Sequence, residues 1–319
     1  MSFLIEPVTF PNRNGLKLFG ILHTPSQPRK DVAIIILSPG IKSRVAPHRL
    51  YVKMAKRFCE MGFCIFRFDP EGIGDSEGEI DEKLTADLYG SIQVGRFVND
   101  TLSAMDWMQQ KYNMSRFILS GLCGGAITGL LAGAKDKRVD GLLSVGIPVI
   151  LDSSRIDRTK YITDGEIEGL KDLYIKKRFS PRAWVRFFTF RSDYRVIFKI
   201  LIKIIRTKVL RTRYQGESLN TPIEASNPKV NGNFNRLFMV AFKKMVNSSR
   251  RMLMIFGEND RLYHEFEEKF VPSYGKELLR LNHTVELYLC KDARHILEFS
   301  WEQKDMLDHT CRWLTANYR

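Results

Sequence analysis

A cysteine between glycines is the residue of this chain best suited to act as a nucleophile. The segment 121–125 (GLCGG) follows an apolar run typical of a buried strand and precedes a run of small residues typical of a helix. A tight turn at such a junction projects its central side chain, and glycines on both sides prevent a Cβ from striking the neighbouring strand or helix. We therefore predict Cys123 as the nucleophile, with Gly121 and Gly125 shaping its turn. The alternative is a cysteine that only fills space in the core.

A carboxylate and a histidine follow later strands and complete a set that can activate a thiol. Asp260 lies just past the strand-like run 251–257, and His295 follows the strand-like run 284–289. The carboxyl ends of parallel strands meet at one edge of a sheet, so the three side chains can converge there. In this interpretation His295 takes the proton of Cys123, and Asp260 holds the imidazole in the required tautomer.

Structural roles compete with these assignments. Asp260 also has the residue type and position of a helix cap, and His295 also fits an exposed loop. Two other histidines compete as the base, because His48 lies near the turn after the first buried strand and His283 directly precedes the last strand run. The chain order of nucleophile, acid and histidine favours the catalytic interpretation of the three residues together.

The most specific motif is the loop 69–78 (DPEGIGDSEG), which follows a buried strand-like run. It resembles the D-x-x-G-x-G-x-S loop of the serine aminopeptidase-like group of α/β-hydrolases, and this resemblance covers residues 1–150 and 245–319. Within that group, the segment 43–49 (SRVAPHR) and the helix-like run 50–61 are similar to hydrolases associated with exosortase systems and bacterial surface polysaccharide loci.

The resemblance implies an α/β-hydrolase fold, with a mostly parallel central sheet flanked by helices and a helical lid insertion. It also implies that the turn 38–41 (SPGI) supplies an N–H group to the oxyanion of a tetrahedral intermediate, so that Ile41 and Gly124 are the expected donors. The chain departs from the family in two places. Ser-Pro-Gly replaces the commoner His-Gly in this turn, and cysteine replaces the usual serine nucleophile.

Cysteine changes the chemistry that such a site performs. A thiolate paired with a histidine attacks a carbonyl carbon and forms a thioester, which stays reactive toward water, alcohols and amines. We therefore expect hydrolysis of an ester or thioester, with a small-molecule or carrier-linked acyl substrate and no cofactor. Two alternatives stay open. One is an acyltransferase of a polysaccharide or lipid pathway, and the other is a catalytically inactive binding protein.

Length and composition limit the domain organisation. With 319 residues, 44% of them hydrophobic, the chain is long enough for one α/β core and a modest insertion. We predict a core of residues 1–150 and 248–319 and a helical, basic lid of residues 151–247. The five cysteines form no C-x-x-C pair, and their placement indicates neither a disulfide framework nor a metal site.

The net charge of +14 is concentrated in the predicted lid. Between Lys176 and Arg213 the chain has 13 basic residues and a single acidic residue, Asp193. Within this stretch apolar residues surround a row of four basic residues at helical spacing, which predicts a basic amphipathic helix. The four basic residues are Arg195, Lys199, Lys203 and Arg206.

Such a helix has two interpretations. Its apolar face can cover the catalytic mouth while its charges are solvated, or its charges can contact an anionic membrane surface or an acidic carrier protein. No apolar run reaches the roughly 20 residues that span a bilayer, and the first residues lack the features of a signal peptide. We therefore expect a cytoplasmic protein, peripheral at the inner face of the membrane in the second interpretation. We expect no nucleic-acid partner, because no nucleic-acid-binding module is recognisable.

Overall fold

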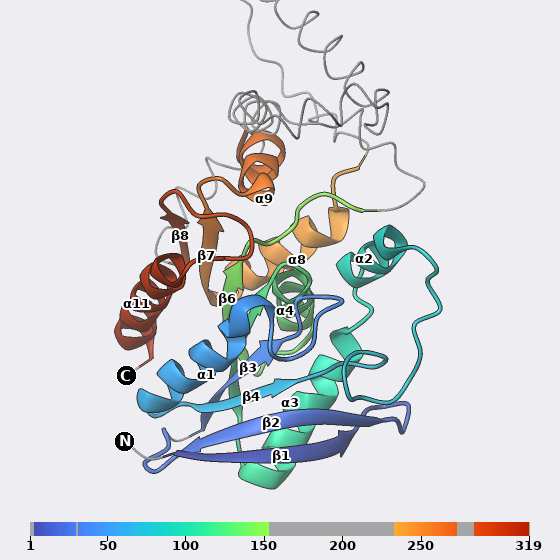
Figure 1. Cartoon of the computed structure of the whole chain (residues 1–319), viewed down its shortest axis with the longest axis vertical. Coiled ribbons are helices and arrows are strands. Elements are labelled where there is room, and N and C mark those ends of the chain that lie inside the picture. Colours follow the sequence, from blue (N-terminus) through green and yellow to red (C-terminus); the bar gives the residue numbers. More distant parts are fainter. Residues whose placement is uncertain (1–2, 30, 153–232, 273–283, 319) are drawn as a thin grey trace, which may run out of the picture. The chain divides into compact units, whose positions relative to one another are not determined.

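A computed structural model describes residues 3–29, 31–152, 233–272 and 284–318 of the chain. These residues belong to one compact unit, formed by residues 1–154 and 233–319. Its centre is an eight-stranded sheet in the order β1-β2-β4-β3-β5-β6-β7-β8 (Figure 1). The predicted lid residues 153–232, which include Arg195, Lys199, Lys203 and Arg206, lie outside the described residues, and so does His283.

The sheet is parallel except at its first strands. β1 pairs with β2 and β2 with β4 in antiparallel directions. All the remaining pairs, from β4–β3 across the sheet to β7–β8, are parallel. This arrangement confirms the predicted mostly parallel sheet. The strands are β1 (Phe3–Pro11), β2 (Lys17–Pro25), β3 (Val32–Leu37), β4 (Cys64–Phe68), β5 (Arg116–Leu122), β6 (Val139–Val145), β7 (Arg251–Gly257) and β8 (Val285–Cys290).

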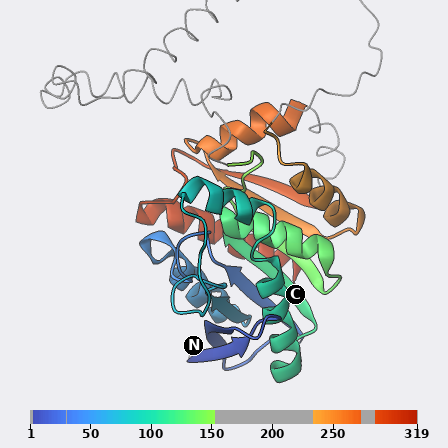
Figure 2. The same ribbon diagram turned by 90° about the vertical axis from the view of Figure 1, so that its right-hand side faces the viewer.

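Helices cover both faces of the sheet (Figure 2). One face carries α1 and α11, and the other carries α3, α4 and α8, with α2 packed against α4. The helices are α1 (Leu50–Glu60), α2 (Thr85–Gln93), α3 (Val98–Tyr112), α4 (Gly124–Lys135), α8 (Arg236–Asn247), α9 (Arg261–Glu265) and α11 (Ser300–Asn317). A 3₁₀ turn (Pro47–Arg49) precedes α1, and a π-helical turn (Phe266–Phe270) follows α9.

Strand β3 shows why the central strands consist almost entirely of apolar residues. All six of its residues are buried: Ile34 and Ile36 pack in the core cluster that contains α1 and α11, and Ala33, Ile35 and Leu37 pack in the opposite cluster. Burial of one such isoleucine stabilises the fold by about 1.5–3 kcal/mol. Because side chains alternate between the faces of a strand, a strand covered on both sides must be apolar at every position.

Helix α8 lies at the end of the range that we predicted as lid, yet it belongs with the core. Its buried face packs on α4, and the ring centroids of Phe238 and Phe270 lie 5.3 Å apart. The second segment of the core therefore begins at residue 233, before the predicted boundary at residue 248. The lid itself stays a prediction. Among the described residues no helix is both long enough and apolar enough to cross a bilayer.

Candidate active site

The backbone at Cys123 has the sharp turn that a nucleophile elbow requires. Cys123 joins β5 to α4 with φ 53° and ψ −112°, a conformation that residues with a Cβ rarely adopt. Its N–H donates to the Val145 carbonyl at 2.9 Å, and its own carbonyl accepts from Ala126 N–H at 3.0 Å. Strain of this kind costs on the order of 1–3 kcal/mol and persists where the surroundings hold it.

The glycines around Cys123 permit this turn by their lack of a side chain. A Cβ on Gly121 would lie well under 3.0 Å from the carbonyl carbon of Gly125, and a Cβ on Gly125 would lie equally close to the Leu37 carbonyl oxygen. Both contacts involve backbone atoms that cannot move aside. The two predicted elbow glycines are therefore required by close packing of β3, β5 and α4.

The structure brings Asp260 and His295 together. The Nδ1 atom of His295 lies 2.9 Å from Oδ2 of Asp260, whose side chain is 1% exposed. The other carboxylate oxygen accepts from Leu262 N–H at 2.9 Å and so caps α9. Asp260 is thus both a helix cap and a partner of the histidine. Gly146, with φ 54°, makes room for the pair, because a Cβ there would lie 3.0 Å from both side chains.

The pKa of the His295 imidazole reflects both Asp260 and Cys123. Burial lowers the pKa, but the hydrogen bonds to Asp260 and Cys123 and the negative charges of these groups raise it to about 10. An imidazole with this pKa keeps a proton that it accepts at neutral pH. The competing histidine, His48, is exposed in the 3₁₀ turn before α1.

The turn that carries Ile41 lies against the elbow. A Cβ on Gly124 would meet the Gly40 Cα at 3.0 Å, and Gly40 itself has φ 109°. The Ser38 hydroxyl closes the turn by donating to the Gly40 and Lys42 carbonyls. The two predicted oxyanion donors therefore lie on segments that touch, one in the turn and one at the first residue of α4.

Two tyrosines near the site were missed by sequence reasoning. Tyr51, fully buried in α1, accepts a hydrogen bond from Leu122 N–H at 2.7 Å, one residue before the nucleophile. Burial raises the pKa of Tyr51, the Leu122 N–H partly opposes this, and the charge of Cys123 adds to the rise. Tyr89 of α2 packs its ring edge on Gly40, where an added Cβ would lie 3.1 Å from the ring. Nothing in the sequence marks either tyrosine, because both contacts join distant segments.

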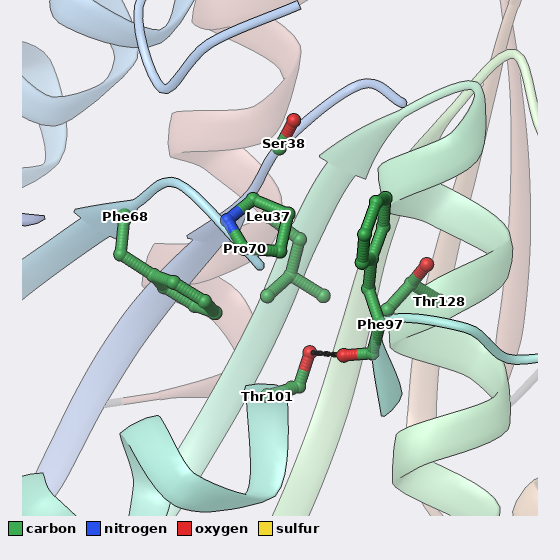
Figure 3. Close-up of a pocket in the computed structure, with 7 residues that line it drawn as sticks. All are labelled: Leu37, Ser38, Phe68, Pro70, Phe97, Thr101 and Thr128. Carbon is green, nitrogen blue, oxygen red and sulfur yellow. Dashed lines mark hydrogen bonds between the residues drawn. The ribbon is translucent and has the colours of Figure 1, made fainter. Parts of the chain in front are cut away.

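A small cavity lies beneath the turn (Figure 3). Its volume is about 10 Å³, enough for one water molecule, and its lining includes Ser38, Phe97 and Thr128. None of Cys123, Asp260 and His295 lines it. The cavity is therefore too small for a substrate and lies apart from the three predicted catalytic side chains. Within the described ranges no three His, Cys, Asp or Glu side chains are grouped so that they could hold a metal ion.

Comparison with curated proteins finds two partial relatives. No family model matches the sequence. The chain is 32% identical over 180 residues to polyketide transferase grgF of Penicillium sp., an alignment that covers 53% of this chain and 55% of that protein. It is 28% identical over 162 residues to the uncharacterised protein PA2218 of Pseudomonas aeruginosa, covering 50% of this chain and 38% of that protein. The chain thus matches about half, or less, of each relative.

Solved structures align over nearly the whole chain. An esterase of Pyrococcus furiosus, Pf2001, aligns with a TM-score of 0.57 and 16% identity over 100% of this chain and 93% of that chain. The α/β hydrolase GrgF from Penicillium sp. sh18 aligns with a TM-score of 0.51 and 19% identity over 98% and 99%. The P. aeruginosa protein PA2218 aligns with a TM-score of 0.53 and 18% identity over 99% and 94%. At these identities the likeness is one of fold.

Proposed function

We propose, from the premise that this chain has the α/β-hydrolase fold, that it is an enzyme which cleaves an ester or thioester through an acyl-cysteine intermediate. Cys123 is the nucleophile, His295 the base and Asp260 the group that orients the imidazole. The observation that carries the proposal is the strained Cys123 turn beside a histidine whose other nitrogen is held by a buried carboxylate. A histidine used only for packing would need neither partner.

Acylation begins with proton transfer from the Cys123 thiol to Nε2 of His295. The sulfur then attacks the carbonyl carbon of the substrate, and the carbonyl π electrons move to oxygen. The N–H groups of Ile41 and Gly124 donate to this oxyanion, and Asp260 stabilises the imidazolium through Nδ1. When the intermediate collapses, the C–S bond stays, the bond to the leaving group breaks, and the His295 proton goes to the leaving group.

Deacylation reverses these roles. His295 takes a proton from water, the oxygen of that water attacks the thioester carbonyl, and the sulfur leaves as a thiolate. The same step with an alcohol or amine in place of water gives acyl transfer. Transfer is therefore our second candidate, and it is favoured by the match to a protein described as a polyketide transferase.

An activated acyl probe tests the proposal. We expect p-nitrophenyl acetate to label Cys123 selectively, because burial raises the pKa of the thiols of Cys59 and Cys290 to about 12. Peptide mass spectrometry locates the label, and Cys123→Ala is the control. Labelling that persists in Cys123→Ala, or a wild type that does not react at all, would leave the binding-protein alternative. Product analysis with and without an added alcohol or amine then separates hydrolysis from transfer.

The partner of the predicted lid is part of the same proposal. We propose that the basic stretch 176–213 contacts an anionic membrane surface, with an acidic carrier protein as the alternative. Each basic residue near an anionic surface contributes about 1 kcal/mol of binding. Replacing Lys199, Lys203 and Arg206 with glutamate should therefore weaken co-sedimentation with phosphatidylserine vesicles by several orders of magnitude, and salt should weaken the wild type. A wild type that does not sediment with these vesicles would contradict the membrane contact.

A further inference from the structure

The loop 69–78 has a part in the site that its resemblance to a family motif does not explain. Asp69, at the end of β4, is fully buried, and its carboxylate accepts from Arg44 N–H at 2.5 Å and from Asp75 N–H at 3.2 Å. A Cβ on Gly74 would lie well under 3.0 Å from the same carboxylate, so this glycine lets the loop close around it. The loop is therefore folded around the Asp69 carboxylate, which also accepts a hydrogen bond from Arg44 N–H.

Arg44 is held through its backbone and its side chain. Its guanidinium pairs with Asp69 and, at 2.7 Å, with Asp75, while its side chain is only 14% exposed. The guanidinium carbon also lies 4.5 Å from the centre of the Phe19 ring. The carbonyl of Arg44 accepts from Arg67 Nη1 at 3.2 Å. Arg44 is thus held at the ends of neighbouring strands through its backbone N–H, its backbone carbonyl and its side chain.

The charges of this cluster balance. Two arginines, Arg44 and Arg67, face two carboxylates, Asp69 and Asp75. His23 Nε2 accepts a hydrogen bond from Nε of Arg67 at 3.1 Å. His23 adds no charge, because burial and the nearby Arg67 lower its pKa to about 4. Removal of Arg44 is costly, since it leaves the fully buried Asp69 carboxylate without this counter-charge.

Arg44 belongs to the segment that carries Ile41, one of the two predicted oxyanion donors. Ile41 lies between Ser38, whose hydroxyl closes the turn onto Gly40 and Lys42, and Arg44. On the far side the segment is tied by Ala46 N–H to the Ser43 carbonyl at 3.0 Å. The segment that carries Ile41 is therefore held on one side, where Gly40 approaches Gly124, and on the other at Arg44.

We propose that Arg44 and Asp69 are positioning residues of the reaction, which hold the turn 38–44 so that the Ile41 N–H points at the developing oxyanion. The inference rests on the proposed function, because it needs Cys123 to attack a carbonyl group. It assigns to the motif loop a task in catalysis, carried out through the ion pair to Arg44 and not by contact with substrate.

Two reactions of the same sulfur separate this role from a merely structural one. Acylation of Cys123 by p-nitrophenyl acetate builds negative charge on a carbonyl oxygen and needs the donors. Alkylation by iodoacetamide forms a C–S bond and expels iodide without any oxyanion, so it needs only the thiolate. A displaced turn should slow the first reaction and leave the second unchanged, whereas general damage to the site should slow both.

The experiment measures both rate constants in full-length variants, with p-nitrophenolate release for acylation and mass spectrometry of the Cys123 peptide for alkylation. We expect Arg44→Ala to slow acylation by about 10-fold to 100-fold, approaching the loss of one oxyanion donor. Arg44→Lys keeps a cation without the two-pronged contact and should fall between Arg44→Ala and wild type. Asp75→Asn, at a carboxylate that is 65% exposed, should show the smallest loss and keeps the test available if Arg44→Ala does not fold.

Arg116→Ala is the matched control, because Arg116 pairs with Asp140 at the opposite end of the strand that carries the elbow. It should leave both rates unchanged. Equal slowing of both reactions in the Arg44 variants, or acylation as fast as in the wild type, would overturn the inference while Cys123 kept its role. A wild-type Cys123 that reacts with iodoacetamide but is never acylated would instead overturn the proposed function, and the inference with it.

Discussion

The elbow at Cys123 and the turn that carries Ile41 touch at Gly124 and Gly40, yet they are held by different forces. The elbow is fixed by backbone packing, since a Cβ on Gly121 or Gly125 would strike main-chain atoms. The turn is fixed by side chains from elsewhere in the chain, chiefly the ion pair of Arg44 with Asp69. The elbow should therefore tolerate almost no change in shape, while the turn should lose accuracy gradually as its partners are removed.

The largest expected effect is at the elbow itself. Cys123→Ala should abolish turnover because it removes the attacking atom, while the fold stays intact because alanine is smaller and the strain at this φ is the same. Activity on an ester substrate and the thermal unfolding midpoint measure the two expectations. Substitution of Cys59 or Cys290, both buried free thiols, is the control and should leave the rate close to wild type. Full activity in Cys123→Ala would remove the triad assignment.

The second-largest effect is expected at the proposed base, His295, and its partner Asp260. His295→Ala should lower the rate by orders of magnitude, because its imidazole is the proposed base that takes the proton of Cys123. Asp260→Asn is the sharper variant. Asparagine still caps α9 through Leu262 N–H, so Asp260→Asn should lose less stability than Asp260→Ala, while the imidazole loses its anionic partner and the rate should fall substantially. Steady-state kinetics with urea unfolding distinguishes the two roles, and a loss of stability equal to that of Asp260→Ala would contradict this separation.

The pH dependence of stability tests the charge state of the same pair. The pKa of His295 is about 10 in the folded chain against an ordinary value of 6.5. A base with a raised pKa in the folded state stabilises the fold fully below the unfolded pKa and loses that contribution as the pH rises through the folded pKa. Wild type should therefore lose stability between pH 6.5 and 10 relative to His295→Gln. Parallel thermal unfolding curves of the two proteins across this range would show that the imidazolium is not formed.

The same contrast explains what could be predicted from the sequence. Cys123, Asp260 and His295 could be predicted as candidates because each follows a strand, and the flanking glycines are a local pattern. The mostly parallel sheet was implied by the resemblance of the loop 69–78 to an α/β-hydrolase motif, and strands buried at every position, such as Val32–Leu37, agree with it. In each case the information lies within a few neighbouring residues.

The partners that hold the turn could not be predicted in this way. Arg44 and Asp69 are 25 residues apart, and Tyr51 and Leu122 are 71 apart, so their pairing depends on which strands become neighbours. The boundary of the predicted lid was misplaced for a related reason. Helix α8 has an apolar face, but an apolar face alone does not say whether it packs on the core or on an insertion.

A glycine substitution measures how rigid the elbow is. Gly125→Ala should destabilise the fold by about 3 kcal/mol, because its Cβ would strike the Leu37 carbonyl oxygen and neither β3 nor α4 can move away. Gly129→Ala, in the same helix, is the matched control, since its Cβ would meet the flexible end of Leu142 at 2.8 Å. Urea unfolding gives the two free energies. Equal losses would mean that the elbow is no more constrained than the rest of α4.

The smallest expected effect concerns a side chain that ties the elbow to a distant helix. In Tyr51→Phe the buried Leu122 N–H loses its acceptor, which costs about 1–3 kcal/mol of unfolding free energy. Because glycine packing still shapes the turn at Cys123, the rate of iodoacetamide alkylation should change little, unlike the acylation rate in the Arg44 variants. Tyr112→Phe, on α3 and packed against Trp107 at 5.3 Å between ring centroids, is the control and should leave both stability and rate near wild type. A large drop in alkylation of Tyr51→Phe would show that the elbow, like the turn, depends on a side chain from elsewhere in the chain, and the contrast between the two segments would disappear.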